Sequence, residues 1–179
     1  MNGRVAVRPR AVLFDRDGTL VHDVPYNGDP QLVRPVAGAR RAVQRLREAG
    51  LRIGLVTNQS GIARGLLTPG AVLAVNDELQ RRVGAFDAVA VCPHGPQDGC
   101  DCRKPAPGLV LRAAGALGLR PEETVVIGDI GADVGAAAAA GARSILVPTP
   151  ATRREEVEEA PLVAPDLVAA VVLVLGGPP

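Results

Sequence analysis

Short apolar runs that alternate with longer stretches of helical periodicity dominate the pattern of this 179-residue chain. Strands buried on both faces have continuous apolar runs, and a helix between successive strands lets them run parallel. The alternation predicts an α/β fold of three layers, in which helices cover both faces of one central parallel sheet. We expect strands over residues 11–15, 51–57, 86–92, 124–129 and 144–149, and helices within residues 35–50, 68–84, 106–118 and 131–141.

The first helical segment carries signals at both of its ends. Pro35 stands near its start and Gly50 at its end, which is the usual asymmetry of helix termini. Its apolar positions recur at helical spacing, so one face is expected to pack on the sheet. These positions are Val36, Ala39, Val43 and Leu46.

The length of the chain suits one α/β core and is short for two full domains. We therefore expect a single domain over residues 1–179, with a core over 11–150 and a C-terminal tail over 151–179. In the tail we expect a solvated helical face at 153–159, a short helix from Ala164 that packs on the sheet, and fraying at 176–179.

Charge and composition argue against several classes of partner. A net charge of +1 and an aromatic content of 2% provide neither a basic field for phosphate backbones nor a platform for stacked bases. No N-terminal stretch has the apolar core of a signal peptide, and the run "LVAAVVLVL" is about half of the roughly 20 residues that cross a bilayer. We expect a soluble, cytoplasmic monomer that binds neither nucleic acid nor membrane.

Polar side chains stand where the predicted strands end. Ligand sites in parallel sheets lie at the carboxyl ends of the strands, so these side chains are expected at one edge. A single acid there is better explained as a helix cap or an ion-pair partner. Several strand ends that carry chemically complementary side chains, here acids, a hydroxyl and the lysine, together favour a catalytic site. The side chains concerned are Asp15, Asp17, Thr57, Asn58, Lys104 and Asp129.

Carboxylates gathered in this way repel one another unless a cation holds them, and hard oxygen ligands suit Mg²⁺. Asp15 and Asp129 are the candidate ligands. Mg²⁺, Lys104, the Thr57 hydroxyl and the amides near Gly18 would neutralise a bound phosphate, so that Asp15 attacks phosphorus. Asp17 shares a face with Asp15 if the strand stays extended, and would exchange protons with the leaving oxygen and then with water.

All three cysteines and the only lysine lie in the stretch "CPHGPQDGCDCRKP". An odd number of cysteines, two of them one residue apart, argues against a disulfide framework. Four nitrogen and sulfur ligands can close a tetrahedral Zn²⁺ shell with no open position. Reduced thiols in a flexible loop are the alternative. The candidate zinc ligands are Cys92, His94, Cys100 and Cys102.

The motifs "DRDGT", "VTNQSGIARG", "CRKP" and "GDIGAD", in this order, resemble the haloacid dehalogenase (HAD) superfamily of phosphatases. More narrowly, they resemble the subfamily IIIA phosphatases of D-glycero-D-manno-heptose 1,7-bisphosphate, which serve the synthesis of activated heptose, and their relatives, the histidinol-phosphate phosphatases. The resemblance implies a Rossmann-like HAD fold, a structural Zn²⁺ and a catalytic Mg²⁺. Related enzymes often carry a cap domain, but the segments between the predicted strands are too short for one, so we expect an open site walled by the loop 21–34, the "NQSGIARG" loop and the cysteine loop. The expected substrate is a small phosphorylated compound, a sugar bisphosphate that loses its 7-phosphate.

The resemblance also implies a role for each matching residue. Asp15 would be the nucleophile, and Asp17 the general acid and base that lends its backbone carbonyl to Mg²⁺. Asp129 would be a metal ligand, and Arg103 would help to recognise the substrate. The phosphate would bind to Thr57, Asn58 and Lys104.

Three positions modify this expectation. Ile130 stands where the heptose bisphosphate phosphatases carry a lysine, which leaves two other substrates open: histidinol phosphate, or a sugar phosphate other than the heptose bisphosphate. Two glycines flank Arg64, which we assign to the rim of the substrate site. His22 is expected in an exposed loop.

Two functions other than catalysis are alternatives. The chain could be an inactive, zinc-stapled binding module, although its catalytic acids are present. A zinc-dependent nucleic-acid binder is disfavoured by the neutral charge.

Overall fold

The computed structural model describes residues 7–176 and contains one five-stranded sheet with the order β3-β2-β1-β4-β5. All four neighbouring pairs are parallel, as predicted. The strand β1 lies in the middle, and every one of its residues is buried. The strands are β1 (Ala11–Phe14), β2 (Arg52–Asn58), β3 (Ala88–Cys92), β4 (Thr124–Gly128) and β5 (Arg143–Leu146).

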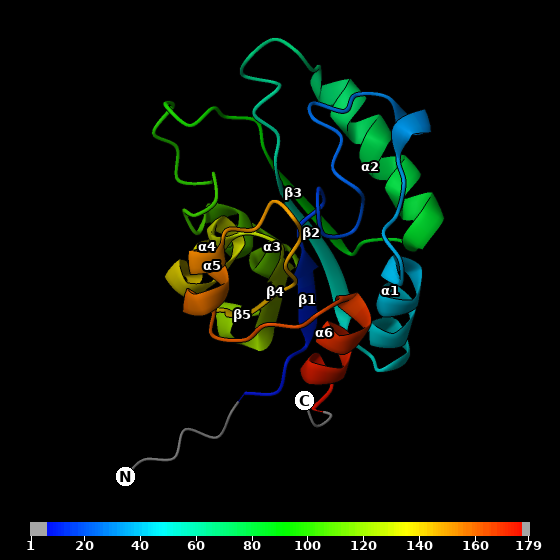
Figure 1. The fold of residues 1–179 in the computed structure, drawn as a ribbon, viewed down its shortest axis with the longest axis vertical. Helices are drawn as coiled ribbons and strands as arrows, with labels where there is room; N and C mark the ends of the chain where they lie inside the picture. The colour runs from blue at the N-terminus through cyan, green and yellow to red at the C-terminus, as the bar shows by residue number, and fades with distance from the viewer. Residues whose placement is uncertain (1–6, 177–179) are drawn as a thin grey trace.

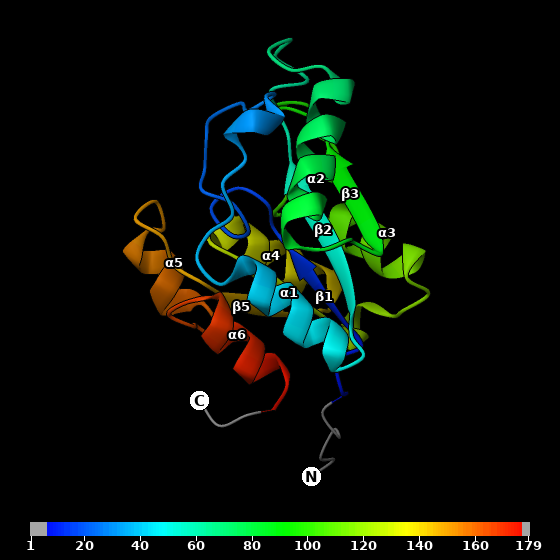
Figure 2. The same cartoon turned by 90° about the vertical axis from the view of Figure 1, so that its right-hand side faces the viewer.

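Helices cover both faces of this sheet, which confirms the three layers (Figures 1 and 2). One face packs against α1 (Ala39–Glu48), α2 (Pro69–Val83) and α6 (Leu167–Val174), and its core includes Val12 and Phe14. The other face packs against α3 (Gly108–Ala116) and α4 (Gly131–Ala140), and its core includes Leu13. Alternate side chains of one strand therefore feed two separate apolar cores. Two 3-10 turns, Pro30–Leu32 and Pro121–Glu123, complete the core region.

The helix α1 begins four residues after Pro35, so the predicted start was wrong. Gly38 precedes the helix with a φ of 82°, a left-handed conformation that ends the extended entry segment and starts the helix. Val36 lies in that segment and packs against the core from outside the helix. The positions Ala39, Val43 and Leu46 are buried as expected.

The C-terminal tail contains the two elements expected of it. The short helix α5 (Arg154–Glu159) has no buried residue, so it presents a solvated face. The helix α6 starts after Asp166, whose side chain accepts a hydrogen bond from the amide of Ala169, and it buries Leu167 and Val171 in the same core as α1. The predicted fraying concerned 176–179, of which 177–179 lie outside the described residues. Across residues 7–176 no helix combines the length and the apolar character that spanning a bilayer requires.

The loops that follow β1, β2 and β3 gather at the carboxyl ends of the strands, at the top of Figure 1. The sheet thus brings segments that are distant in sequence to one edge. Within the described residues these connecting loops carry no inserted cap domain.

Candidate active site

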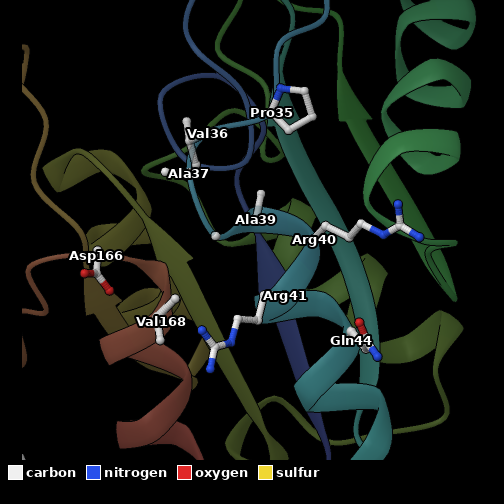
Figure 3. A pocket seen from close by; sticks show the side chains of 10 residues that line it. Pro35, Val36, Ala37, Ala39, Arg40, Arg41, Gln44, Asp166 and Val168 are labelled. Atoms are coloured by element: carbon white, nitrogen blue, oxygen red, sulfur yellow. The ribbon is translucent and has the colours of Figure 1, made fainter.

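A cavity of about 340 Å³ opens at the carboxyl ends of the strands. A larger groove, about 650 Å³, lies between the starts of α1 and α6 (Figure 3), and its charged side chains are Arg40, Arg41 and Asp166. Only the smaller cavity combines several carboxylates with a buried ammonium. Its lining includes Asp15, Asp17, Thr57, Asn58, Lys104, Asp129 and Asp133, which come from the ends of β1, β2 and β4, the loop after β3 and the start of α4.

The ammonium of Lys104 is buried in this cavity, where it makes three contacts. Its Nζ lies 2.5 Å from Asp15 Oδ1 and 2.5 Å from Asp133 Oδ1, and it donates to the Val56 carbonyl at 3.0 Å. Although burial opposes its charge, the two carboxylates raise the pKa of Lys104. An ammonium can donate in three directions at once, which explains why the single lysine of the chain stands here.

Asp15 directly follows β1, and its amide donates to the Ile127 carbonyl at 2.9 Å. Burial raises the pKa of its carboxyl group to about 8, while the charge of Lys104 opposes this rise. A carboxylate in such a place is costly unless cations surround it. The site is therefore built to hold a further positive charge against Asp15.

The chain turns after Asp15, so the expectation of one extended face for Asp15 and Asp17 was wrong. The turn nevertheless brings both carboxyl groups to the same cavity. Gly18 makes the turn possible because its φ is 82°, and a Cβ atom there would lie 2.2 Å from Asp129 Oδ2. Any side chain at this position would displace a carboxylate of the site.

Asp129 and Asp133 flank the start of α4. Asp129 accepts from the Thr19 hydroxyl at 3.3 Å, and burial, followed by the charge of Asp133, raises its pKa to about 6. Oxygens of Asp15, Asp129 and Asp133 lie within 4.8 Å of one another. Three buried carboxylates at this spacing fit Mg²⁺, which binds oxygen ligands at about 2.0–2.1 Å.

Asp133 is a site residue that our sequence reasoning did not assign. Its signal was the second acid of "GDIGAD", which falls in the first turn of α4. A Cβ at Gly128 would lie 2.2 Å from Asp133 Cγ, so the glycine that ends β4 leaves room for this carboxylate. The contact between Asp133 and Lys104 joins residues 29 positions apart, which no local pattern indicates.

Thr57 and Asn58 end β2 beside this group. Thr57 is buried, and its hydroxyl oxygen accepts from Gln59 Nε2 at 2.9 Å, which leaves the hydroxyl hydrogen for another acceptor. The Asn58 side chain is held by the main chain of Lys104: its Oδ1 accepts from the amide at 3.1 Å, and its Nδ2 donates to the carbonyl at 3.2 Å. Asn58 thus fixes where Lys104 enters the cavity.

Arg64 and Arg103 do not line the cavity. Arg64 is exposed and lies over the ring of Tyr26, 5.8 Å from its centroid, while Tyr26 itself lines the mouth. Arg103 donates to the His94 carbonyl at 3.2 Å. Lys104 is the one residue of the cysteine loop that lines the cavity. The loop therefore holds Lys104 in place and forms little of the cavity wall. His22 is exposed in a loop, as expected.

The four predicted zinc ligands converge. Cys92 Sγ lies 3.1 Å from Cys102 Sγ and 3.8 Å from Cys100 Sγ, and His94 Nδ1 lies 3.2 Å from Cys102 Sγ. A tetrahedron with zinc–sulfur bonds of about 2.3 Å has sulfur–sulfur edges of about 3.8 Å. The three cysteines are free thiols. This donor set therefore fits Zn²⁺ as a closed structural centre.

The thiols differ in how readily they lose a proton. Burial, helped by the hydrogen bond with Cys102, raises the pKa of Cys92 to about 12. At Cys100 burial also opposes ionisation, but hydrogen bonds from the backbone of Arg103 and Cys102 outweigh it and lower the pKa to about 7. Because zinc binds thiolates, the lowered pKa of Cys100 favours the form of this thiol that binds the metal.

The zinc cluster is tied to the catalytic loops by main-chain hydrogen bonds. The amide of Gln59 donates to the Cys92 carbonyl at 2.7 Å, and the amide of Ala63 donates to the Pro93 carbonyl at 3.1 Å. Lys104 follows two residues after Cys102. A metal in the cluster would therefore fix the loop that presents Lys104.

Comparisons with known proteins agree with this geometry. A HAD-hydrolase-like family model matches residues 101–175. The chain is 37% identical over 145 residues to the D-glycero-β-D-manno-heptose-1,7-bisphosphate 7-phosphatase of Bordetella bronchiseptica, covering 78% of this chain and 81% of that protein. It is 35% identical over 168 residues to the protein of the same name from Pseudomonas putida, covering 89% of this chain and 96% of that protein.

Structural similarity extends over nearly the whole chain. The crystal structure of D,D-heptose 1,7-bisphosphate phosphatase from B. bronchiseptica, complexed with magnesium and phosphate, matches with a TM-score of 0.82 and 33% identity. The match covers 93% of this chain and 98% of that chain. The identity, the coverage and the shared fold lead to one conclusion: the chain belongs to the HAD-like phosphatases, in the family of the D-glycero-β-D-manno-heptose-1,7-bisphosphate 7-phosphatases.

Proposed function

We propose that the protein is a Mg²⁺-dependent phosphomonoesterase that removes the 7-phosphate of D-glycero-D-manno-heptose 1,7-bisphosphate through an aspartyl-phosphate at Asp15. The observation that carries the proposal is the contact of Lys104 with Asp15 and Asp133 at 2.5 Å each, inside a cavity where three carboxylates fit a metal ion. Relatives named for this activity support the substrate.

In the first step a carboxylate oxygen of Asp15 attacks phosphorus, a new oxygen–phosphorus bond forms, and the bond from phosphorus to the sugar oxygen breaks. Asp17 gives its proton to that leaving oxygen, which departs as an alcohol. Lys104 and the Thr57 hydroxyl donate hydrogen bonds to the phosphoryl oxygens. Mg²⁺ would be held by Asp15 and Asp129, two of the three clustered carboxylates, and by the Asp17 carbonyl, and it would supply charge neutralisation.

In the second step water attacks the phosphorus of the aspartyl-phosphate and gives a proton to the Asp17 carboxylate. The bond between Asp15 and phosphorus breaks, inorganic phosphate leaves, and both carboxyl groups return to their starting states. Asp133 keeps Lys104 charged and directed at Asp15 throughout the cycle.

Substrate selection is proposed to rest on the mouth of the cavity. Asn58 is proposed to place Lys104 for phosphate binding, and Arg64 to extend the mouth by way of Tyr26. Arg103 is proposed to meet the part of the substrate outside the cavity. Ile130, which is 37% exposed, lines the cavity and gives this mouth an apolar side chain.

We further propose a cytoplasmic monomer that acts on a small sugar phosphate and binds neither nucleic acid nor membrane. The near-neutral charge and low aromatic content support the absence of nucleic-acid binding. We propose one domain over residues 1–179, since α6 of the tail shares a core cluster with α1 of residues 11–150.

The test of the function is phosphate release with and without Mg²⁺ from heptose 1,7-bisphosphate, histidinol phosphate and common sugar phosphates. We expect Mg²⁺-dependent release with preference for the heptose bisphosphate. Preference for another ester would keep the mechanism and replace the substrate. No release from any ester would favour an inactive, zinc-stapled binding module.

Loss of zinc is expected to reduce phosphatase activity because the zinc cluster anchors the loop that presents Lys104. Cys100→Ser should lower bound zinc from about one ion per chain towards none, and phosphate release should fall with it because the loop before Lys104 loses its anchor. Elemental analysis and the phosphate assay on the same sample measure both quantities. His22→Ala is the control, since it alters a histidine outside the cluster. Unchanged zinc content in the Cys100 variant would contradict the assignment.

Mg²⁺ binding is expected to weaken as the pH falls. A metal-bound carboxylate must be ionised, whereas in the metal-free protein the pKa of Asp15 is about 8 and that of Asp129 about 6. Below pH 8 a proton therefore competes with Mg²⁺, and the Kd should rise up to about tenfold per pH unit for each proton displaced. Calorimetry in two buffers of different ionisation enthalpy counts these protons. In Asp15→Asn the Kd for Mg²⁺ should change less with pH between pH 6 and 8. A Kd that does not change with pH in the unmodified protein would refute the competition between protons and Mg²⁺.

A further inference from the structure

Arg16, between the two aspartates of "DRDG", is the largest fully buried side chain, with 1% of its surface exposed. A buried guanidinium is costly unless each of its donors is paired. None of the steps described above uses this residue. Its burial beside the proton-transferring carboxyl group therefore needs a cause.

The guanidinium holds Asp17 on one side and α2 on the other. Its Nε lies 3.0 Å from Asp17 Oδ1 and 3.1 Å from Oδ2, and its Nη2 lies 3.0 Å from Oδ2. Its Nη1 donates to Asn76 Oδ1 at 3.0 Å. Asn76 is 2% exposed on the core side of α2, so the far end of the guanidinium is anchored to a rigid element.

Asn76 carries a cost that supports this anchoring role. Its Nδ2 is buried and has no hydrogen-bond partner among the described residues. An unpaired buried amide nitrogen costs about 1–3 kcal/mol. An apolar side chain at this core position would avoid that cost. What asparagine provides instead is an oxygen that accepts the hydrogen bond from Arg16 Nη1.

The hydrogen bonds also distinguish the two oxygens of Asp17. Oδ2 accepts from Arg16 and from Gln59 Nε2 at 2.9 Å, whereas Oδ1 accepts from Arg16 Nε alone. A carboxylate oxygen has two lone pairs, so Oδ2 is filled and Oδ1 keeps one free. Gln59 Nε2 also donates to Thr57, which aligns this carboxyl group with the phosphate side of the cavity.

We propose that Arg16, anchored by Asn76, is a positioning residue that orients the Asp17 carboxyl group so that Oδ1 exchanges the proton with the leaving oxygen. This inference rests on the proposed phosphatase mechanism. A lysine cannot replace the planar fork, because a single ammonium does not reach both Asp17 oxygens and Asn76 together.

The test compares kcat/KM for two esters, because this ratio reports the steps up to departure of the leaving group. Heptose 1,7-bisphosphate needs a proton on its leaving oxygen, whereas 4-nitrophenyl phosphate releases a stable anion. Arg16→Lys is expected to lower kcat/KM about 100-fold for the heptose ester, within the range of general acid catalysis. For the nitrophenyl ester the expected loss is less than about threefold, because little proton transfer is needed.

Asn76→Leu provides a second variant if Arg16→Lys does not fold. It removes the unpaired amide but also leaves Arg16 Nη1 without its acceptor. These two costs are of similar size, so the variant should stay folded with a similar melting temperature, and it should show the same selective loss at about tenfold. Arg47→Lys is the matched control, since Arg47 forks to Asp87 away from the cavity at 3.1 Å. Both esters should be hydrolysed normally by that control.

The outcomes separate the two proposals. An equal loss on both esters, or no loss on either, in variants that fold would overturn the role of Arg16. If the unmodified protein hydrolyses neither ester, the proposed function itself fails. Selective loss on the heptose ester supports both.

Discussion

Asp15→Asn is expected to lower the rate of phosphate release by about 10⁴-fold or more, because loss of a catalytic nucleophile has effects of this size. An amide oxygen in the same place is a poor nucleophile and cannot form the aspartyl-phosphate. The fold should persist. Lys104 keeps its contact with Asp133 at 2.5 Å, and an uncharged amide lacks the burial cost that raises the pKa of Asp15 to about 8.

Phosphate release and circular dichroism melting of the same preparations check both parts. Asp77→Asn, an exposed acid of α2, is the matched control and should leave both unchanged. Substantial activity in the Asp15 variant, with its melting temperature preserved, would eliminate the covalent mechanism. A large fall in melting temperature would instead assign Asp15 a structural role.

Lys104→Met is expected to impair both activity and stability. Loss of one charged donor to a transferring group lowers kcat by about 10²–10³-fold. The substitution also leaves Asp15 and Asp133 buried without their cation, and removal of one partner from a buried pair costs about 3–5 kcal/mol. For a chain of this length that corresponds to a fall of about 10 °C in melting temperature.

Melting is measured in Mg²⁺-free buffer, because the metal would stabilise the remaining carboxylates. The double variant Lys104→Met with Asp133→Asn separates the two effects. It should recover much of the stability, since one uncompensated charge is gone, but none of the activity. If the double variant recovered activity as well, Lys104 would act only by balancing Asp133.

The relation between sequence and structure differs from element to element. The five strands and the helices between them were predicted close to their observed bounds because apolar periodicity is a local property. The start of α1 was misplaced, since Pro35 suggested a helix terminus while Gly38, with its φ of 82°, is where the helix begins. The turn after Asp15 was missed for a related reason, since Gly18 breaks the extended conformation.

For the site, the strand-end argument brought Asp15, Asp17, Thr57, Lys104 and Asp129 to one edge, and they all line one cavity. It did not assign Asp133 as a partner of Lys104. A side chain at a strand end can point in several directions, and packing of distant segments selects one of them.

By itself the sequence determined the α/β alternation, the position of the catalytic motifs at the carboxyl ends of parallel strands and the convergence of a Cys/His cluster. Each depends on spacing along the chain. Only the tertiary structure decided that Lys104 pairs with Asp133 as well as Asp15, and that Arg16 reaches Asn76, 60 residues away. These contacts follow from how helices α2 and α4 pack on the sheet, and packing depends on the shape of the whole core.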